Sequence, residues 1–292
     1  MDASIVIVSH NGRDLLRRCL ASVYKHAQGI DFEVVVVDNA STDGTPGLVR
    51  SEFPDVRLAA RDTNSGFAGG VNEGCGLAKG EHVLLLNPDA ELSMNILPPM
   101  LAHLSEHPDV GILAPKIVDP DGSVQLSCRR FPDFTAPLFN RYSLFTRLFR
   151  GNPLSRRYLM TDFDHQHTSD VDWASAACWL VRRTTLDRVG ALDEGYFWSI
   201  EDVDYCQRVH RAGLRVVYFP QVSILHHIGG SARTQPSKAI AARHRGMWRY
   251  YRAYMRPTRV ALRPFVDAAV WCGIRTRWGV QLAASKVAGE PG

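Results

Sequence analysis

Five short polar motifs in this chain carry residue types that bind phosphates, hold metals or move protons. The most informative is Asn87-Pro88-Asp89, which directly follows the apolar run Val83 to Leu86. A carboxylate after a strand can hold a divalent cation at the carboxyl edge of a parallel sheet, where open α/β folds bind ligands. Asn-Pro-Asp is also a common turn, so it predicts a diphosphate and metal site only together with its neighbours.

A second motif places Glu201, Asp202 and Asp204 within four positions, just after Trp198 and at the start of a predicted helix. The helix dipole favours anions at that end. Capping needs only one carboxylate, and three such groups repel one another unless one is protonated, metal-bound or acting as a base. The cluster therefore predicts a functional acid or base.

The third motif runs from Val37 to Gly44 and begins with Asp38 at the end of a predicted strand. A carboxylate in that position can accept a hydrogen bond from a base N–H or a ribose hydroxyl. Ser41, Thr42 and Asp43 are expected to cap the helix that follows, because these residue types favour such positions.

The last two motifs are the glycine-rich segment Asn64 to Asn72 and the strand end His226-His227. The glycines permit close approach of the backbone to a ligand, but no Gly-x-Gly-x-x-Gly fingerprint is present, so NAD is not expected. Histidine at a strand end either completes a metal shell, contacts a diphosphate or has a structural role, and the residues leave these alternatives open.

Alternating strands and helices position these motifs. Apolar runs typical of buried parallel strands alternate with leucine and valine at helical spacing, which predicts a doubly wound, Rossmann-like, mostly parallel sheet. The predicted strands are 4–9, 32–37, 56–60 and 82–86, and the predicted helices are 11–27, 45–53, 69–79 and 94–106.

The second half of the chain is less regular. A hairpin turn is predicted at Asp119 to Gly122, and residues 129–170 are expected to form long ordered loops or a flap over a site. Further predictions are a return to ordered structure at 171–181, a helix at 201–212, strands at 214–219 and 222–226, and two tail helices from Lys238 broken near Pro257 and Pro264.

Composition and charge narrow the class of protein. The 292 residues have the apolar and charged fractions of a globular protein, and the six cysteines show no zinc or Cys-x-x-Cys spacing, so we expect reduced thiols. Neither a secretion signal nor a spanning helix is expected. The net charge of +4 conceals a basic tail, because 12 Lys or Arg and two acids follow residue 230. This aromatic, basic tail fits an anionic membrane surface, a nucleic acid or a solvated helical face.

Six ordered motifs give the chain a family resemblance. SIVIVSHN, VVDNASTDG, NSGFAGGVN, LLLNPDA, IEDVDYCQR and HHIGGS closely resemble the family 2 inverting glycosyltransferases of the GT-A fold, over residues 3–250. PKIVDPDGSVQLSCRRFP, ASAACWLVRR and ALDEGYFWSIEDVDYCQR look like bacterial rhamnosyltransferases that extend lipid-linked glycans. The resemblance implies a catalytic domain at 1–230, with a donor half to about 115 and an acceptor half from 116, and a helical tail at 231–292.

The resemblance also implies roles for individual residues. Asp202 corresponds to the catalytic base, with Glu201 beside it orienting the acceptor, while Trp198 and Asp204 belong to the acceptor side. Asp89 stands at the metal-ligand position, with Asn87 in place of the first carboxylate of the family's Asp-x-Asp. His226 matches a histidine near the metal or diphosphate, with His227 as the alternative register. The donor-binding residues would be Ser9, Asn11, Asp38, Asn64, Gly66, Phe67, Asn72 and Asn87.

The function expected from the resemblance is inverting transfer of L-rhamnose from dTDP-L-rhamnose to a lipid-linked glycan, with Mg²⁺ or Mn²⁺, on the cytoplasmic face of the inner membrane. Two alternatives stay open: a UDP-sugar donor with a capsular or O-antigen acceptor, and a non-catalytic nucleotide-sugar binding protein. Binding of nucleic acid is not expected, because the positive charge is confined to the tail and the first 230 residues carry more acids than bases.

Overall fold

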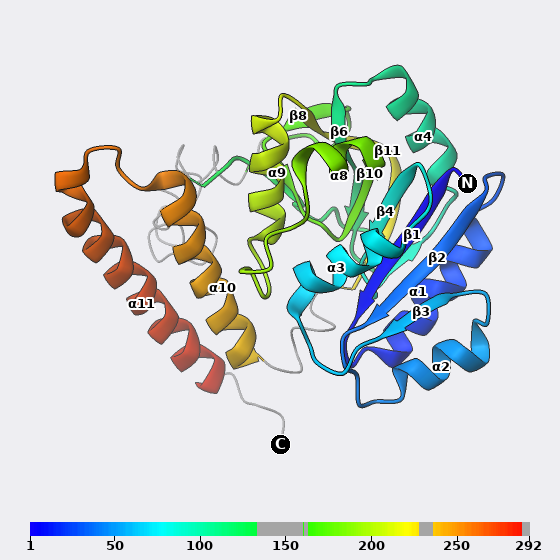
Figure 1. Ribbon diagram of the computed structural model, residues 1–292, viewed down its shortest axis with the longest axis horizontal. Helices are drawn as coiled ribbons and strands as arrows, with labels where there is room; N and C mark the ends of the chain where they lie inside the picture. The colour runs from blue at the N-terminus through cyan, green and yellow to red at the C-terminus, as the bar shows by residue number, and fades with distance from the viewer. Residues whose placement is uncertain (133–159, 161–162, 228–235, 288–292) are drawn as a thin grey trace.

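The computed structural model describes residues 1–132, 160, 163–227 and 236–287. Its centre is a nine-stranded sheet in the order β3-β2-β1-β4-β10-β6-β11-β5, with β8 beside β11 (Figure 1). Six of these strands, β1, β2, β3, β4, β6 and β11, run in one direction, and β5, β8 and β10 run in the other. The predicted mostly parallel α/β sheet is therefore confirmed.

The first half of the chain alternates strands and helices as its apolar pattern predicts. Each boundary of the predicted elements lies within a few residues of the expected one, and only the short strand β5 was not predicted. The elements are β1 (Ala3–Ser9), α1 (Arg13–His26), β2 (Phe32–Asp38), α2 (Thr45–Glu52), β3 (Arg57–Ala60), α3 (Gly66–Leu77), β4 (His82–Leu86), β5 (Ala90–Leu92) and α4 (Leu97–Glu106).

The second half returns to the same sheet and ends in two tail helices. Its elements are β6 (Val110–Val118), β7 (Cys128–Arg129), β8 (Ser169–Val171), β9 (Trp173–Ala174), β10 (Cys178–Arg182), α8 (Arg183–Val189), α9 (Glu201–Arg211), β11 (Arg215–His226), α10 (Pro236–Tyr250) and α11 (Arg263–Val287). A π-helical turn (Tyr251–Met255) and a 3₁₀ turn (Val260–Leu262) join α10 to α11.

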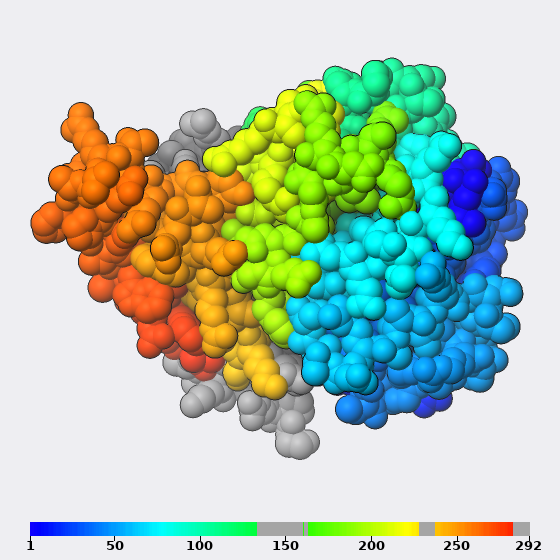
Figure 2. Space-filling model, in the orientation of Figure 1, coloured from blue at the N-terminus to red at the C-terminus, as the bar shows by residue number. Residues whose placement is uncertain are grey.

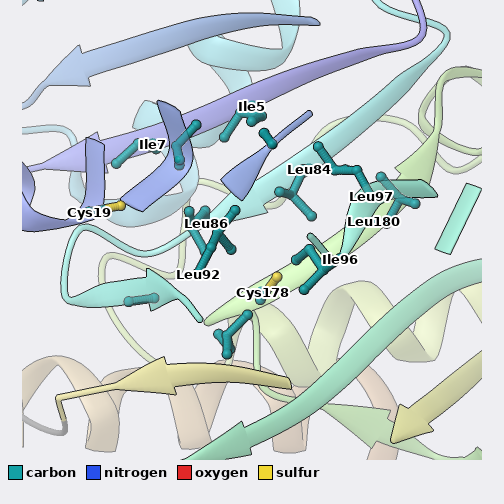
Figure 3. Packing of buried hydrophobic residues seen from close by; sticks show 14 of the residues in the cluster. Ile5, Ile7, Cys19, Leu84, Leu86, Leu92, Ile96, Leu97, Cys178 and Leu180 are labelled. Atoms are coloured by element: carbon teal, nitrogen blue, oxygen red, sulfur yellow. The ribbon is translucent and has the colours of Figure 1, made fainter. Parts of the chain in front are cut away.

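Helices cover both faces of the sheet, which explains why its strands are apolar along their length. Alternate residues of β1 point to opposite faces. Ile5 and Ile7 pack with α1, α2 and α4 (Figure 3), whereas Val6 and Val8 pack with α3 and α9. The carboxyl ends of β1, β2 and β4 consequently meet at one open edge of the sheet, where the polar motifs follow.

Two strand predictions need correction. Strand β6 was missed, because Pro115 and Lys116 interrupt its apolar run although most of it is buried. The ordered structure expected at 171–181 consists of the end of β8 followed by β9 and β10. The strands predicted at 214–219 and 222–226 form one strand, β11, with a register shift between Phe219 and Ser223. Pro220 lies in that shift and cannot donate to the ladder.

The predicted hairpin turn and the two predicted tail helices are present in the structure. The hairpin turn at Asp119 to Gly122 is confirmed by two backbone hydrogen bonds, from the Asp119 N–H to the Ser123 carbonyl and from the Gly122 N–H to the Asp119 carbonyl, and by a bridge between Val118 and Val124. Much of the predicted loop or flap at 129–170 lies outside the described residues. The tail forms the two expected helices, and Pro264 lies in the first turn of α11, where its missing N–H costs nothing. Among the described residues, no helix is long and apolar enough to cross a membrane.

Candidate active site

Two polar side chains with unpaired atoms lie side by side at the carboxyl ends of β1 and β2. Ser9 and Asp38 are register partners, and each is only 1% exposed. One carboxylate oxygen of Asp38 accepts from the backbone N–H of Ser41 at 2.9 Å, while its Oδ1 and the Oγ of Ser9 lack partners. Buried polar atoms without partners are costly, so this pair fits a site completed by the hydroxyls or N–H groups of a ligand.

The segment after Asp38 is held by Asn11 rather than by helix capping alone. Asn11 has a positive φ of 51°, its backbone N–H donates to the Ser41 hydroxyl, and its side-chain oxygen accepts from the backbone N–H of Thr42. Asp43 accepts from the backbone N–H of Thr45, the first residue of α2. The capping prediction therefore applies to Asp43 only, and Asn11 acts by shaping the loop beside Asp38.

The glycine-rich motif forms a tight turn before α3. The side-chain oxygen of Asn64 accepts from the N–H of Gly66, whose φ is +78°, and the N–H of Phe67 donates to the carbonyl of Phe197. A Cβ on Gly66 would lie 2.3 Å from that carbonyl oxygen, so only glycine fits. Asn39, which was not predicted, holds the turn to the third motif through a 2.7 Å bond from its amide to the Gly66 carbonyl.

Asn72 uses its side chain to tie α3 to a distant loop. Its amide donates to the Leu192 carbonyl and to Glu194, each at 2.9 Å, and its oxygen accepts from the Leu192 N–H at 2.8 Å. All of these partners belong to the chain itself. Asn72 therefore positions the segment that leads to the acidic cluster. Both the nitrogen and the oxygen of its side-chain amide are already hydrogen-bonded within the chain.

The structure brings Asp89 and His226 together from opposite ends of the chain. The Asp89 carboxylate lies 3.2 Å from Nε2 of His226, and Asp89 is only 7% exposed. His227 points elsewhere, with its Nε2 2.9 Å from Glu91. Of the two register alternatives, His226 is therefore the one that faces Asp89.

Gln125 orients His226 and was missed in the sequence. Its amide nitrogen donates to Asp119 and to the His226 carbonyl, so its Oε1 faces Nδ1 of His226 at 2.9 Å. This arrangement places a ring proton on Nδ1 and directs Nε2 toward Asp89. The only sequence signal for Gln125 was its place in the matching segment SVQLSC.

Asp89 and His226 fit a divalent cation that shares its shell with phosphates. Among the described residues, no group of three or more His, Cys, Asp or Glu side chains is arranged around a metal position. Mg²⁺ is usually held by one or two carboxylates plus phosphates and water, so one carboxylate with an imidazole suits an ion bound together with a diphosphate. Asn87 is half-buried beside them.

The other half of the site is the start of α9. Ser199 and Ile200 both have positive φ values, 67° and 79°, and α9 begins at Glu201 immediately after them. Glu201 is 6% exposed and its Oε2 has no partner, while Asp202 is half-buried and accepts from the backbone N–H of Val203 at 2.9 Å. This turn places two adjacent carboxyl groups at the start of α9.

Burial separates the acid–base properties of the two carboxyl groups. Desolvation raises the pKa of Glu201 strongly, and the neighbouring charge of Asp202 raises it further. Burial also raises the pKa of Asp202, but backbone hydrogen bonds and the Arg129 guanidinium on β7 partly oppose this rise. Glu201 is therefore the member of the pair that keeps a proton, and Asp202 is the member available as a base.

A short segment, residues 175–177, lies between the two halves of the site. The carbonyl of Ala177 accepts from the backbone N–H of Asn87. The backbone of Ala176 lies close enough to Asp202 to lower the pKa of that carboxyl. Asn87, two residues before Asp89, and the candidate base are therefore both near the same short piece of backbone.

Asp204 requires a correction. It is 3% exposed, and its carboxylate accepts from Tyr196 at 3.3 Å, from Arg208 at 3.0 Å and from Tyr254 of the tail at 2.7 Å. An acceptor role for Asp204 does not fit this burial, and its partners assign it to holding the tail. Trp198 is half-buried next to Phe197, which is 47% exposed, so these rings are the better candidates for contact with an acceptor.

Comparison with known proteins agrees with this geometry. The model of glycosyl transferase family 2 matches residues 4–189. The chain is 32% identical to the N-acetylglucosaminyl-diphospho-decaprenol L-rhamnosyltransferase of Mycobacterium tuberculosis, over 84% of this chain and 82% of that protein. It is 24% identical to the rhamnosyltransferase WbbL of Escherichia coli, over 84% of this chain and 91% of that protein.

Solved structures show the same fold. The mannosyltransferase PcManGT of Pyrobaculum calidifontis, solved with GDP-Man and Mn²⁺, superposes with a TM-score of 0.57 at 20% identity, over 99% of this chain and 76% of that chain. GalNAc-T7, solved with UDP, GalNAc and Mn²⁺, gives 0.56 at 19% identity, with 77% of this chain covering 43% of that one. The predicted GT-A fold is confirmed, and the chain belongs to glycosyl transferase family 2.

Proposed function

We propose that this enzyme is an inverting rhamnosyltransferase that moves L-rhamnose from dTDP-L-rhamnose to a hydroxyl of a glycan carried on a polyprenyl diphosphate. The observation that carries the proposal is that residues 175–177 contact both the turn that holds Asn87 and Asp89 and the carboxyl of Asp202, so that the Asp89–His226 pair and the candidate base belong to one site. The names of the Mycobacterium tuberculosis and Escherichia coli relatives supply the sugar, and the former also supplies the lipid-linked acceptor.

The chain's own residues account for a single displacement. Asp202 takes the proton of the acceptor hydroxyl. The hydroxyl oxygen then forms a bond to the anomeric carbon, while the bond from that carbon to the diphosphate oxygen breaks on the opposite side. Protonated Glu201 beside Asp202 can donate a hydrogen bond to the acceptor. One displacement inverts the anomeric configuration.

The donor is held at the sheet edge. Ser9 and Asp38 offer unpaired polar atoms to the nucleoside, and the turn of Asn64, Gly66 and Phe67 brings backbone close to it. Asp89 and His226, with Asn87 beside them, would hold Mg²⁺ or Mn²⁺ against the diphosphate. A cation bound there supplies Lewis acidity for the charge that develops on the leaving group.

Transfer assays with purified donor and a synthetic lipid-linked acceptor test the proposal. Asp202→Asn is expected to lose about 10²- to 10⁴-fold in kcat with unchanged donor affinity, as removal of a general base predicts. Asp187→Asn, on an exposed α8 carboxylate, is the matched control and keeps full activity. Full activity of Asp202→Asn contradicts the assigned base.

A donor panel separates the proposal from its alternatives. Stabilisation by dTDP-rhamnose with Mg²⁺ or Mn²⁺, but not by UDP-glucose or UDP-galactofuranose, supports the rhamnosyl donor. A preference for a UDP-sugar replaces the donor while keeping the reaction type. Donor binding without transfer to any lipid-linked or capsular acceptor favours a non-catalytic binding protein.

We also propose that residues 1–230 form the catalytic domain and that residues 231–292 form a tail that holds the enzyme on the cytoplasmic face of the inner membrane. The boundary lies in the segment 228–235, outside the described residues. Large apolar side chains of the tail are exposed, with fractions of 68% for Val260, 47% for Leu262 and 75% for Phe265. Arginines flank them, a combination that suits anionic lipid.

A further inference from the structure

The turn that starts α9 is conformationally unusual. Ser199 and Ile200 are consecutive left-handed residues, and Ile200 is β-branched, a residue type that rarely adopts positive φ. Such a conformation is energetically costly and persists only where the surroundings impose it. Because Glu201 and Asp202 follow directly, whatever holds this turn also sets the position of the catalytic pair.

Helix α10 of the tail packs on this turn through a glycine. A Cβ on Gly246 would lie 3.0 Å from the Ser199 carbonyl oxygen and 3.3 Å from the Ile200 side chain. Gly246 is buried, and the α10 backbone therefore lies directly against the strained residues. Figure 2 shows the orange tail against the yellow-green segment that contains this turn.

Arg249, one turn further along α10, holds the loop that leads into the turn. Its guanidinium makes two bonds to the Asp193 carboxylate, at 2.7 and 2.8 Å, and lies 5.5 Å from the ring centre of Tyr196. A Cβ on Gly195 would collide with this guanidinium, at 2.2 Å from Cζ. The loop thus has a glycine where the tail arginine crosses it.

Two tail tyrosines hold the first turns of α9 itself. Tyr254 donates to Asp204 at 2.7 Å, and Tyr250 donates to Gln207 at 3.2 Å. Tyr250 and Tyr254 also pack with Tyr196, Ile200 and Val203 in a small separate core. The tail therefore contacts the loop, the strained turn and the helix.

We propose that the tail segment 236–255 positions the catalytic pair, with Gly246, Arg249 and Tyr254 as positioning residues. They act through Ser199 and Ile200 and through Asp204, and they do not touch the reacting atoms. The loop of residues 193–200 is also fixed on its other side, where the Phe197 carbonyl accepts from the Phe67 N–H. Phe67 belongs to the turn Asn64 to Phe67, here called the donor turn. This inference rests on the proposed role of Asp202 and makes the tail part of the active site as well as a membrane contact.

Gly246→Ala tests the proposal, with Gly273→Ala on α11 as the matched control because a Cβ at Gly273 meets nothing within 4 Å. We expect Gly246→Ala to lower kcat by about tenfold or more, since small misplacements of catalytic groups are costly, and to leave the dissociation constant of the donor unchanged. We also expect a displaced acidic limb in the pH profile of kcat, because the surroundings of Asp202 change. Gly273→Ala keeps both kcat and the profile.

Tyr254→Phe provides a second test if Gly246→Ala does not fold. It removes only the hydroxyl that binds Asp204, and we expect lower kcat and a displaced pH profile without a change in donor affinity. If the folded variants show wild-type kcat and pH profile, the proposal is wrong.

Asp202→Asn distinguishes this proposal from the assignment of the base. Loss of activity in Asp202→Asn together with wild-type kcat in Gly246→Ala and Tyr254→Phe overturns the positioning role and keeps the base. Retained activity in Asp202→Asn together with impaired tail variants overturns the base and leaves the tail as a positioning element for another group at this helix start.

Discussion

At the residue scale, the site depends on carboxyl groups whose surroundings differ although they are adjacent in sequence. Glu201 is buried with an unpaired oxygen, whereas Asp202 is partly exposed and accepts backbone hydrogen bonds. The sequence showed only that three carboxylates crowd a helix start. Which of them keeps a proton depends on burial and on nearby polar groups, and some of these, such as the backbone of Ala176 that lowers the pKa of Asp202, lie far away in the chain.

Glu201→Gln is expected to change how stability depends on pH. The folded-state pKa of Glu201 is raised above its unfolded value of about 4.3. The contribution of protonated Glu201 to the free energy of unfolding is therefore fully present below about pH 4.3 and is lost as the pH rises through the folded-state pKa. Glutamine stays neutral, and the variant should therefore be more stable than the wild type at pH 9, by at least about 1 kcal/mol, with a difference that vanishes near pH 4.

Thermal unfolding across this pH range measures the effect, which corresponds to a rise of a few degrees in Tm at pH 9. Glu106→Gln, on an exposed carboxylate, is the control and should give parallel curves. A wild-type protein more stable than Glu201→Gln at pH 9 contradicts the assigned burial effect.

Gln125→Leu is expected to weaken metal binding. Without the amide oxygen, nothing fixes the His226 proton on Nδ1, and the ring loses its orientation toward Asp89. Loss of such an orienting partner typically costs about 10–100-fold in metal affinity. Titration with Mn²⁺ in the presence of dTDP, followed by electron paramagnetic resonance, measures the change. Gln28→Leu, an exposed glutamine outside the site, is the control, and equal affinity in both variants contradicts the role of Gln125.

At the element scale, the donor turn and the loop of residues 193–200 form one contact that sequence patterns do not reveal. Gly66 was predicted for close approach to a ligand, but its hydrogen atoms face the Phe197 carbonyl of the chain itself. Likewise, Asn72 was predicted to bind the donor, and in the structure its side chain binds Leu192 and Glu194. Sequence patterns therefore do not distinguish residues that contact a ligand from residues that hold the loops of the candidate site together.

Gly66→Ala should be more destabilising than Gly122→Ala. Both glycines have φ near +80°, but only Gly66 is crowded, because a Cβ at Gly122 meets nothing within 4 Å. Gly122→Ala reports the backbone strain alone, about 1–2 kcal/mol. We expect Gly66→Ala to add a further loss of stability and to raise KM for the donor. Chemical denaturation and initial rates measure both, and equal destabilisation by the two substitutions contradicts the tight contact with Phe197.

Local sequence patterns predicted the first half of the fold better than the second half. The alternation of buried strands and helices up to Glu106 is a local pattern and was predicted to within a few residues. Strand β6 and the broken strand before Cys178 were not, because β6 contains a proline and a lysine and residues 175–177 turn away toward Asn87 and Asp202. Pairing between such distant segments leaves no periodicity in either of them.

At the scale of the whole molecule, the basic tail has two faces with different surroundings. One face of α10, together with the π-helical turn after it, packs on α9 through Tyr250 and Tyr254, where it buries Asp204. The junction with α11 and the outer part of α11 instead expose Leu262, Phe265 and Val280. Deleting the tail would therefore uncover a core next to α9, so point substitutions on the exposed side are the sharper test of the proposed membrane contact.

Leu262→Ser with Phe265→Ser should weaken membrane binding and spare catalysis on a short, water-soluble acceptor. These side chains are 47% and 75% exposed, and Arg259 and Arg263 beside them supply charge for anionic lipid. We expect recovery with phosphatidylglycerol vesicles to fall several-fold, and wild-type binding to decrease with salt, since each basic residue near the surface contributes about 1 kcal/mol of screened attraction. Met94→Ser, an exposed apolar residue of the catalytic domain, is the control. If the double variant sediments with vesicles as the wild type does while Tm and soluble activity are unchanged, the tail junction is not the lipid contact.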